Sequence, residues 1–378
     1  PDKLLCHPDC TAPYQPGAVS PVSITEWPRA ILHLDMDAFY VNVHVLDYPA
    51  DAGVPLVIGG RPEQRGVVAS ASYEARKLGV RSAMPTSHAL RLCPQLKIVA
   101  ANWPRIRECS RQVMDVLRPF GPLEQMSVDE AYVDLSGQGE PEALAAHIRQ
   151  AVKMATGLPA SVGLATSKLV AKVASDFDKP EGLTVVQPGA EATFLAPLPA
   201  RVIWGIGPRT AEKLTQLDIH TCGQLAVADL GTLQAVFGRQ AADLQQRAQG
   251  VDGRSVHAER GQVKSISQER TFNTDVNDAV FLREQLRKMC SRVAQELQRK
   301  NLLAYTVFVK FRWADFTTFT RQRSVTVGLD DADEIYRLAA AIWQENWPPE
   351  RRMRLLGVGV SKLEETAVRQ LGFDFGSQ

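Results

Sequence analysis

Short hydrophobic runs alternate with helical patterns along most of the chain. The runs Ala30–Leu34 and Leu123–Val128 are each typical of a β-strand, and acidic residues follow both runs directly. Helical patterns occupy Ala38–Val45 and Pro141–Thr156. This order of elements predicts a small α+β unit with a mixed or antiparallel sheet.

A second unit is predicted to be mostly helical. Within it, Gly205-Ile206-Gly207 lies between helical patterns at Pro197–Trp204 and Arg209–Leu217, which predicts a helix-hairpin-helix. Glycines at such a turn let DNA approach the backbone closely, and the N-terminus of the next helix offers free N–H groups to a phosphate.

The last unit returns to strands. Two helices are predicted, at Asp278–Lys300 and Ala332–Asn346. The predicted strands are Ser265–Phe272, Thr306–Trp313, Thr317–Val327 and Leu355–Lys362. No internal repeat is visible.

Length and composition indicate a soluble globular protein of two to four domains. The chain has 378 residues, of which 45% are hydrophobic and 22% charged. No apolar run approaches the ~20 residues needed to span a membrane, and the first thirty residues lack the pattern of a signal peptide, so we expect a cytoplasmic protein. The six cysteines form no disulfide framework, and Cys6-His7-x-x-Cys10 has no second pair that would complete a zinc site.

The charge distribution indicates a local surface for nucleic acid. Formal net charge is only +1, but the segment Arg254–Arg323 holds fourteen Lys and Arg against seven Asp and Glu. Basic residues at alternate strand positions can follow a phosphate backbone. The alternative is a solvated sheet face.

Two acidic clusters are the strongest candidates for chemistry. Asp35 and Asp37 follow the first strand, and Asp129 and Glu130 follow the second run. If the two strands are neighbours, the carboxylates converge and offer the hard oxygen ligands that Mg2+ prefers. The alternative is that they are ordinary turn carboxylates. For Asp37 we favour a role as the N-cap of the following helix.

The order of these motifs closely resembles that of the Y-family translesion DNA polymerases, and most of all their bacterial DNA polymerase IV branch. The likeness extends from about residue 29 to the end. It rests on segments 35–40, 66–85, 127–134, 174–182, 204–214, 264–272 and 369–375.

The resemblance implies an α+β multidomain fold, the right-hand polymerase with palm, small fingers, helical thumb and C-terminal little finger. The domains it predicts are an N-terminal extension (1–28), a palm (29–38 and 102–186), fingers (39–101), a thumb with the helix-hairpin-helix (187–254), a linker (255–263), a little finger (264–365) and a C-terminal tail (366–378).

It also implies the catalytic residues. Asp35 and Asp129 would bridge two Mg2+ ions, and Glu130 would complete the site at the primer 3′-hydroxyl. The carbonyl of Met36 would bind the ion on the nucleotide side. Two cations can make the 3′-oxygen reactive and neutralise charge on the transferred phosphoryl group.

The nucleotide contacts are implied in the same way. Tyr40 would lie beneath the sugar as a steric gate, where its ring excludes a 2′-hydroxyl; the alternative is a core residue. Tyr73 and Arg76 share one helix face and would reach the β- and γ-phosphates, and Lys179 would approach from the palm. Small residues would form a permissive roof over the nascent base pair, or else merely pack tightly: Ala69, Ser70, Ala71, Ala83 and Met84.

Three partners follow from the resemblance. Primer-template DNA would bind Gly205, Gly207, Lys213, Lys264, Arg270, Lys310 and Arg312. A dNTP would be the substrate. The bacterial sliding clamp would take a C-terminal peptide, with Gln370 at the rim of a groove and Leu371, Phe373 and Phe375 as apolar anchors; the alternative is a tail that packs back on the little finger.

We therefore expect a monomeric, error-prone, DNA-directed DNA polymerase that tolerates damaged templates. A nucleotide cyclase also uses two metals on a palm-like sheet, but it has no use for a helix-hairpin-helix. A catalytically dispensable scaffold in a repair complex would not need Asp35, Asp129 and Glu130.

Overall fold

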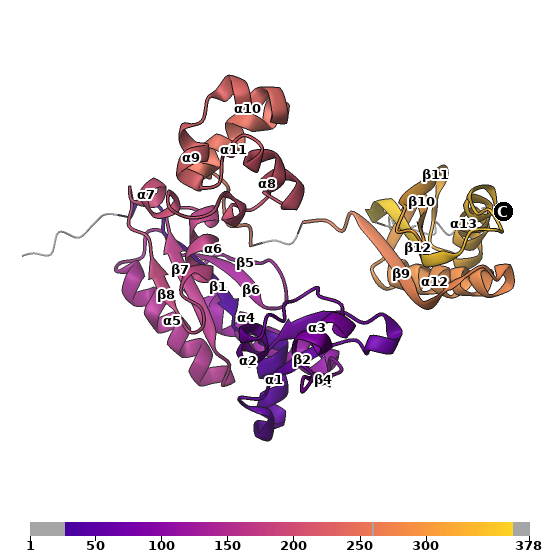
Figure 1. Ribbon diagram of the computed structural model, residues 1–378, viewed down its shortest axis with the longest axis horizontal. Helices are drawn as coiled ribbons and strands as arrows, with labels where there is room; N and C mark the ends of the chain where they lie inside the picture. The colour runs from indigo at the N-terminus through magenta and orange to yellow at the C-terminus, as the bar shows by residue number, and fades with distance from the viewer. Residues whose placement is uncertain (1–26, 259–260, 366–378) are drawn as a thin grey trace, which may run out of the picture.

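The computed structural model describes residues 27–258 and 261–365. Its elements form four units, and three of these contain a β-sheet (Figure 1). We use the names palm, fingers, thumb and little finger for them. No described helix is long and apolar enough to cross a membrane. The four described cysteines are free and buried; Cys6 and Cys10 lie outside the described residues.

The palm contains a five-stranded sheet in the order β5-β6-β1-β7-β8. Its central strand β1 pairs antiparallel with β6 and with β7. The strands are β1 (Ile31–Met36), β5 (Leu123–Gln125), β6 (Glu130–Asp134), β7 (Ala160–Ala165) and β8 (Leu183–Val185). The helices are α4 (Trp103–Leu117), α5 (Pro141–Thr156) and α6 (Lys168–Phe177).

Strict alternation along β1 explains why one face of this sheet is apolar and the other carries polar groups. Leu32 and Leu34 join the core under α4 and α5. Successive side chains of a strand point to opposite faces, so His33 and Asp35 point to the face that α6 covers. The acidic residue at the end of the strand is thus held on a rigid sheet.

The fingers contain a three-stranded sheet in the order β3-β2-β4. The strands are β2 (Leu56–Gly59), β3 (Val68–Ala71) and β4 (Lys97–Val99), the α-helices α1 (Phe39–Asp47), α2 (Tyr73–Lys77) and α3 (Thr86–Leu92), and the 3₁₀ turns η1 (Pro49–Asp51) and η2 (Pro62–Gln64). Helix α1 joins this unit to the palm, because its apolar residues contribute to both cores.

The thumb is helical, with α7 (Glu191–Leu195), η4 (Ala200–Val202), α8 (Pro208–Thr215), α9 (Cys222–Val227), α10 (Leu230–Phe237), η5 (Gly238–Gln240) and α11 (Ala241–Ala248). The predicted helix at Pro197–Trp204 was wrong, since only the turn η4 forms there. Pro197 and Pro199 have no amide hydrogen and disfavour the helical conformation of the residues before them.

The little finger contains a four-stranded antiparallel sheet in the order β11-β10-β12-β9. Its strands are β9 (Ser265–Val276), β10 (Leu302–Trp313), β11 (Thr318–Leu329) and β12 (Met353–Glu365). The helices α12 (Ala279–Arg299) and α13 (Ala332–Asn346) pack on one face, and each begins at an aspartate whose side chain caps it.

The chain leaves the thumb along the palm before it enters the little finger. The guanidinium of Arg29 donates to the carbonyls of Asp252 at 3.2 Å and Arg254 at 2.8 Å. The amide of His257 donates to the carboxylate of Glu124 at 2.8 Å. The first half of the predicted linker is therefore bound to the palm. The little finger itself stands apart from palm and thumb (Figure 1) and meets the fingers through an ion pair of 2.6 Å between Arg65 and Asp275.

Candidate active site

The pairing of β1 with β6 brings the two acidic clusters together as expected, although β5, which precedes the second cluster, is not a neighbour of β1. Asp35 lies directly opposite Glu130 in the register of these strands. The amide of Met36 donates to the carbonyl of Asp129 at 2.9 Å. The second cluster occupies the turn before β6 and its first residue, not the end of β5. Residues that are about ninety positions apart in the sequence thus form one acidic edge of the palm sheet.

Ser127 organises the turn that carries the second cluster. Its hydroxyl donates to the carboxylate of Asp129 and accepts the backbone amides of Asp129 at 3.1 Å and Glu130 at 3.2 Å. Burial raises the pKa of Asp129, and the neighbouring carboxylates of Asp35 and Glu130 act in the same direction. The site therefore holds crowded negative charge that a cation would relieve.

Two lysines, of which only Lys179 was predicted, lie among these carboxylates. Nζ of Lys172 on α6 lies 2.8 Å from Oδ2 of Asp35 and 3.0 Å from Oε2 of Glu130. Nζ of Lys179 lies 2.6 Å from Oδ1 of Asp35, and both ammonium groups also contact Asp176. Among the described residues, no group of three His, Cys, Asp or Glu side chains is arranged to hold a metal ion. Instead, lysine ammonium groups pair with the acidic edge.

The charges of these groups support each other. Burial acts to lower the pKa of Lys172, but the carboxylates of Asp35 and Asp176 raise it overall. The pKa of Glu130 is lowered to about 2, first by the facing imidazole of His33 and, against the effect of burial, by Lys172. Lys172 is therefore a cation and Glu130 an anion at neutral pH.

His33 is a buried polar residue that the sequence analysis did not single out. Its Nδ1 pairs with Oγ of Ser175 at 2.8 Å. Its Nε2 faces Oε2 of Glu130 at 3.5 Å, which is long for a hydrogen bond but close enough to favour the charged form of the carboxyl group. Burial lowers the pKa of His33, so the ring is neutral. It packs against the carboxylate of Glu130 on the α6 side of the sheet.

Asp37 is not the N-cap that we favoured. The N-cap of α1 is Ala38, with φ 41° and no side-chain cap. The carboxylate of Asp37 is buried and accepts the hydroxyls of Ser161 and Tyr73, at 2.9 and 3.0 Å, and the amide of Glu181 at 2.8 Å. These tertiary donors satisfy the carboxylate, so it is not available to the start of the helix.

Tyr40 lies in the first turn of α1, close to the acidic edge. Burial raises the pKa of its phenol, and the charge of Asp129 adds to this effect. Its ring meets Trp103 edge to face, with centroids 5.5 Å apart. The neighbouring Phe39 is buried in the palm core, as expected. Tyr40 is only partly buried.

The predicted nucleotide contacts of the fingers, Tyr73 and Arg76, both lie on α2. Arg76 packs over the ring of Tyr73, with its guanidinium carbon 4.9 Å from the ring centroid, and donates through Nε to the carbonyl of Ala71 at 3.0 Å. Burial and then Asp37 raise the pKa of Tyr73, so its phenol stays protonated and can donate. Tyr73 therefore links α2 to Asp37 in the palm.

The predicted roof divides into exposed and buried residues. Ala83 and Met84 lie beside β3, because the amide of Ala83 donates to the carbonyl of Val68 and the amide of Val68 to that of Met84. Ala69 and Ala83 are exposed, and Met84 is partly buried. Ser70 and Ala71 are buried, with Ala71 in the fingers core. Of the five predicted roof residues, only Ala69, Ala83 and Met84 have side chains exposed enough to face a base pair.

The thumb presents its predicted turn at the surface. Gly205 has φ 97°, and Gly207 is the N-cap of α8, while Ile206 between them is buried. A residue with a Cβ at position 205 would be strained, because this φ belongs to the left-handed region. Lys213 on α8 is exposed and lies 6.0 Å from the ring centroid of Phe237. Backbone and ammonium are thus both accessible.

The predicted basic residues of the little finger lie on opposite faces of its sheet. Lys310 and Arg312 alternate with buried Val309 and Phe311, so they lie on the face that α12 and α13 leave open. Arg270 pairs with Leu356, which is buried under the helices, and donates to Gln285 of α12 at 2.6 Å. The predicted stripe of bases is therefore split, because cross-strand partners share a face. Lys264 is exposed just before β9.

The predicted clamp-binding residues Gln370, Leu371, Phe373 and Phe375 lie outside the described residues.

Comparison with known proteins gives consistent matches along the chain. Residues 34–176 match the "impB/mucB/samB family", residues 263–373 match its C-terminal domain, and residues 202–252 match "DNA polymerase-iota, thumb domain". The chain is 41% identical to DNA polymerase IV of Halorhodospira halophila over 89% of this chain and 96% of that protein. It is also 41% identical to DNA polymerase IV of Methanoculleus marisnigri, over 93% of this chain and 99% of that protein.

A solved structure has the same arrangement of elements. A Y-family DNA polymerase chimera superposes with a TM-score of 0.79 and is 26% identical in sequence, and the match covers 89% of this chain and 99% of the chimera.

Proposed function

The chain belongs to the Y-family DNA polymerases, the impB/mucB/samB family, and on this premise we propose how its own side chains carry out the reaction. It is a DNA-directed DNA polymerase of the translesion type with the palm, fingers, thumb and little finger of that family. Primer-template DNA and dNTPs are its substrates, and polymerases of this family use divalent metal ions.

We propose that the acidic edge holds two Mg2+ ions. Asp35, Asp129 and Glu130 would hold the ions together with the backbone carbonyl of Met36, with Glu130 near the primer 3′-hydroxyl and Met36 near the nucleotide. Carboxylate and carbonyl oxygens are the donors that Mg2+ prefers. When bound, two such ions neutralise charge on the reacting phosphoryl group and make the primer 3′-oxygen more reactive. The ammonium groups of Lys172 and Lys179 would then have to move away from Asp35, because they occupy its carboxylate oxygens.

The palm and fingers position the triphosphate in this proposal. Lys179 carries a compact positive charge at the acidic edge, and Arg76 offers a planar fork from α2. Tyr73 keeps its phenol bonded to Asp37 at 3.0 Å, which fixes the base of α2 against the palm. The chain would therefore supply positive charge to the triphosphate from both the palm and the fingers.

The gate and the roof set substrate choice. The exposed part of the Tyr40 ring would occupy the space that a 2′-hydroxyl needs, which discriminates by exclusion and not by added attraction. Ala69 and Ala83 offer only methyl groups to the nascent pair, so distorted bases meet few steric checks. Met84 is the larger side chain at this edge and would narrow the range of lesions.

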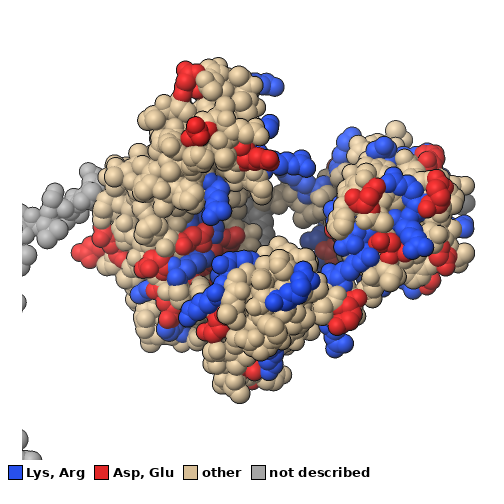
Figure 2. Space-filling model, viewed as in Figure 1, with Lys and Arg blue, Asp and Glu red and all other residues tan. Residues whose placement is uncertain are grey.

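We propose that DNA lies between the thumb turn and the open face of the little finger. Gly205, Gly207 and Lys213 would contact one stretch of backbone, and Lys310 and Arg312 another. Figure 2 shows Lys and Arg side chains along much of the gap between thumb, fingers and little finger. Basic groups that contact phosphates release counterions from the DNA, which favours binding. These local contacts can therefore bind DNA although the net charge of the chain is only +1. Arg270 is not included, because α12 binds it.

Two further proposals concern assembly. The protein would act as a monomer, and its C-terminal peptide at Gln370, Leu371, Phe373 and Phe375 would dock onto the sliding clamp. An open active site retains DNA weakly, and a tether raises the effective concentration at the primer end.

The observation that carries the proposed mechanism is the register of β1 and β6, which sets Asp35 opposite Glu130. The test is primer extension with purified protein, Mg2+ and templates that carry defined lesions. We expect incorporation opposite normal and damaged bases and none in EDTA. A protein that binds primer-template but never extends it would instead be a scaffold.

A further inference from the structure

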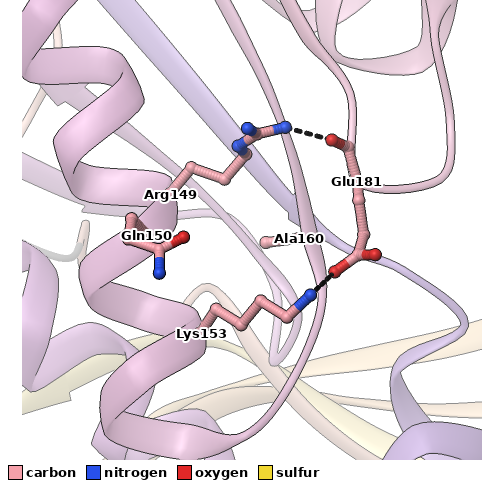
Figure 3. A pocket seen from close by; sticks show the side chains of 5 residues that line it. All are labelled: Arg149, Gln150, Lys153, Ala160 and Glu181. Atoms are coloured by element: carbon pink, nitrogen blue, oxygen red, sulfur yellow. Dashed lines mark hydrogen bonds and ion pairs between the residues drawn. The ribbon is translucent and has the colours of Figure 1, made fainter. Parts of the chain in front are cut away.

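A small polar pocket lies between α5 and the loop that carries Glu181 (Figure 3). It has a volume of about 150 Å3 and is lined by Arg149, Gln150, Lys153, Ala160 and Glu181. Arg149 and Lys153 lie one turn apart on α5, and both point at Glu181 across the pocket (Figure 3). Nothing in the mechanism above uses these residues.

The two basic side chains hold different parts of Glu181. The guanidinium of Arg149 donates to its backbone carbonyl, and the ammonium of Lys153 pairs with its carboxylate. The side chains of Lys153 and Glu181 are 52% and 47% exposed. An ion pair so exposed contributes little to folding stability. Glu181, however, belongs to a loop whose other side reaches the acidic edge.

The opposite side of the same loop enters the site. The amide of Glu181 donates to Oδ2 of Asp37 at 2.8 Å, and Lys179, two residues earlier, reaches Oδ1 of Asp35 at 2.6 Å. Glu181 has φ 56°, and a Cβ on Gly182 would lie 1.9 Å from the carbonyl oxygen of Asp178. Glu181 thus connects the two basic residues of α5 with Asp37, and it belongs to the same loop as Lys179.

We propose that Arg149 and Lys153 are positioning residues for the triphosphate of the incoming nucleotide. From the outer surface of the palm, they fix Glu181 and so set where Lys179 meets the phosphates. This inference rests on the proposed role of Lys179. Small displacements of a substrate-binding group can cost large factors in turnover. The effect appears in the use of dNTP and not in the binding of DNA.

The test uses charge reversal in the full chain, measured by steady-state primer extension. Lys153→Glu places two carboxylates against each other and should raise KM for dNTP about tenfold, with kcat reduced less and DNA affinity unchanged. Glu181→Lys should do the same. The double variant Lys153→Glu/Glu181→Lys should return KM to within about threefold of the original value, and Lys153→Arg should keep it.

Gln150→Ala is the matched control, because Gln150 lines the same pocket but is not one of the groups that hold Glu181. We expect it to leave KM unchanged. The inference is overturned if both reversed single variants retain the original KM, or if the double variant does not recover while its circular dichroism shows a folded protein. An unsubstituted chain that fails to extend primers would instead refute the proposed function, so the two failures are distinct.

Discussion

Nζ of Lys172 lies 2.8 Å from Oδ2 of Asp35, although 137 positions separate the two residues in the chain. The ammonium group is brought there by α6, which packs across the face of the sheet that carries Asp35 and Glu130. Its charge offsets the mutual repulsion of these carboxylates and of Asp176. Lys172 therefore does for the acidic edge what a divalent cation would do, and the two should compete.

Replacement of Lys172 by Met should make the fold more dependent on Mg2+. Without the ammonium, the carboxylates lose their partner, and because Lys172 is 25% exposed we expect a loss of about 1 to 3 kcal/mol in EDTA, less than for a fully buried pair. A cation stabilises the folded state more when it binds more tightly, by RT ln(1 + L/Kd) where L is the concentration of free cation, so Mg2+ should raise Tm further in Lys172→Met than in the original protein. The measurement is thermal unfolding in EDTA and in Mg2+.

Lys168→Met is the matched control for this prediction. Lys168 lies on the same helix and pairs at 2.6 Å with Glu124, away from the acidic edge. Its loss should lower Tm without increasing the response to Mg2+. Equal responses of the two variants would show that Lys172 and the cation do not share ligands.

Asp129→Ala should abolish incorporation, with a loss of at least about 10³ in turnover, because the proposed bridging ligand serves both cations. DNA binding should change little. The fold should tolerate the change, since burial and neighbouring carboxylates already disfavour the charge of Asp129. Asp115→Ala removes an exposed acid on α4 and should extend primers normally. Substantial turnover of Asp129→Ala in single-nucleotide assays would remove the two-metal assignment.

Tyr40→Ala should raise ribonucleotide incorporation relative to deoxynucleotide incorporation by orders of magnitude, because it opens the space of the 2′-hydroxyl. Trp103→Ala removes the neighbour that meets the Tyr40 ring edge to face and should produce a smaller change in the same direction. The double variant should resemble Tyr40→Ala alone. The quantity to compare is the ratio of kcat/KM for ribonucleotides to that for deoxynucleotides. An unchanged ratio in Tyr40→Ala would show that Tyr40 is a core residue and not a steric gate.

Local patterns were sufficient to predict most of the elements, whereas the meeting of the two acidic clusters followed only if their strands were neighbours. The run before Asp35 forms β1, and α5 runs from Pro141 to Thr156, both as expected. Proline in the first turn and glycine after the last residue mark the ends of that helix. These signals depend only on neighbours in the sequence, which is why they could be interpreted without the fold.

Residues whose roles depend on distant contacts could not be placed in advance. A local rule makes Asp37 a helix cap, but donors from Tyr73, Ser161 and Glu181 overrule it. Lys172 stands in α6 like any surface lysine, and only packing against β1 reveals its partners. Arg270 seemed equivalent to Lys310 because the register between β9 and β12, with its irregularity between Met353 and Leu355, is not visible in either strand alone.

Deletion of residues 370–378 should leave extension without the clamp intact and abolish its stimulation by a loaded clamp. The anchors Leu371, Phe373 and Phe375 would otherwise fill an apolar groove, and the tether would raise the local concentration of polymerase at the primer end. Gly372-Phe373-Asp374 separates the aromatic residues, so single alanine substitutions of Phe373 and Phe375 are needed to find the register. Undiminished stimulation after the deletion would assign the main clamp contact to another surface.

The two faces of the little-finger sheet should differ in their effect on salt-dependent DNA binding. Each phosphate contact adds about 0.9 to the slope of log K against log salt. Lys310→Ala/Arg312→Ala removes two cations from the open face, so the slope should become shallower by about 2. Arg323 pairs with Val307 in the register and binds Glu345 of α13, so it lies on the helix-covered side.

Arg323→Ala is therefore the matched control, since it removes one positive charge from the same sheet but no proposed phosphate contact. Its slope should equal that of the original protein. Fluorescence anisotropy of labelled primer-template over a series of salt concentrations measures all three proteins, and a chain that ends at Gly253 gives the lower limit of the slope. Equal slopes for the double variant and the original protein would move the DNA contacts off the open face. A reduced slope for Arg323→Ala alone would instead place DNA contacts at the edge strand β11, because Arg323 belongs to that strand.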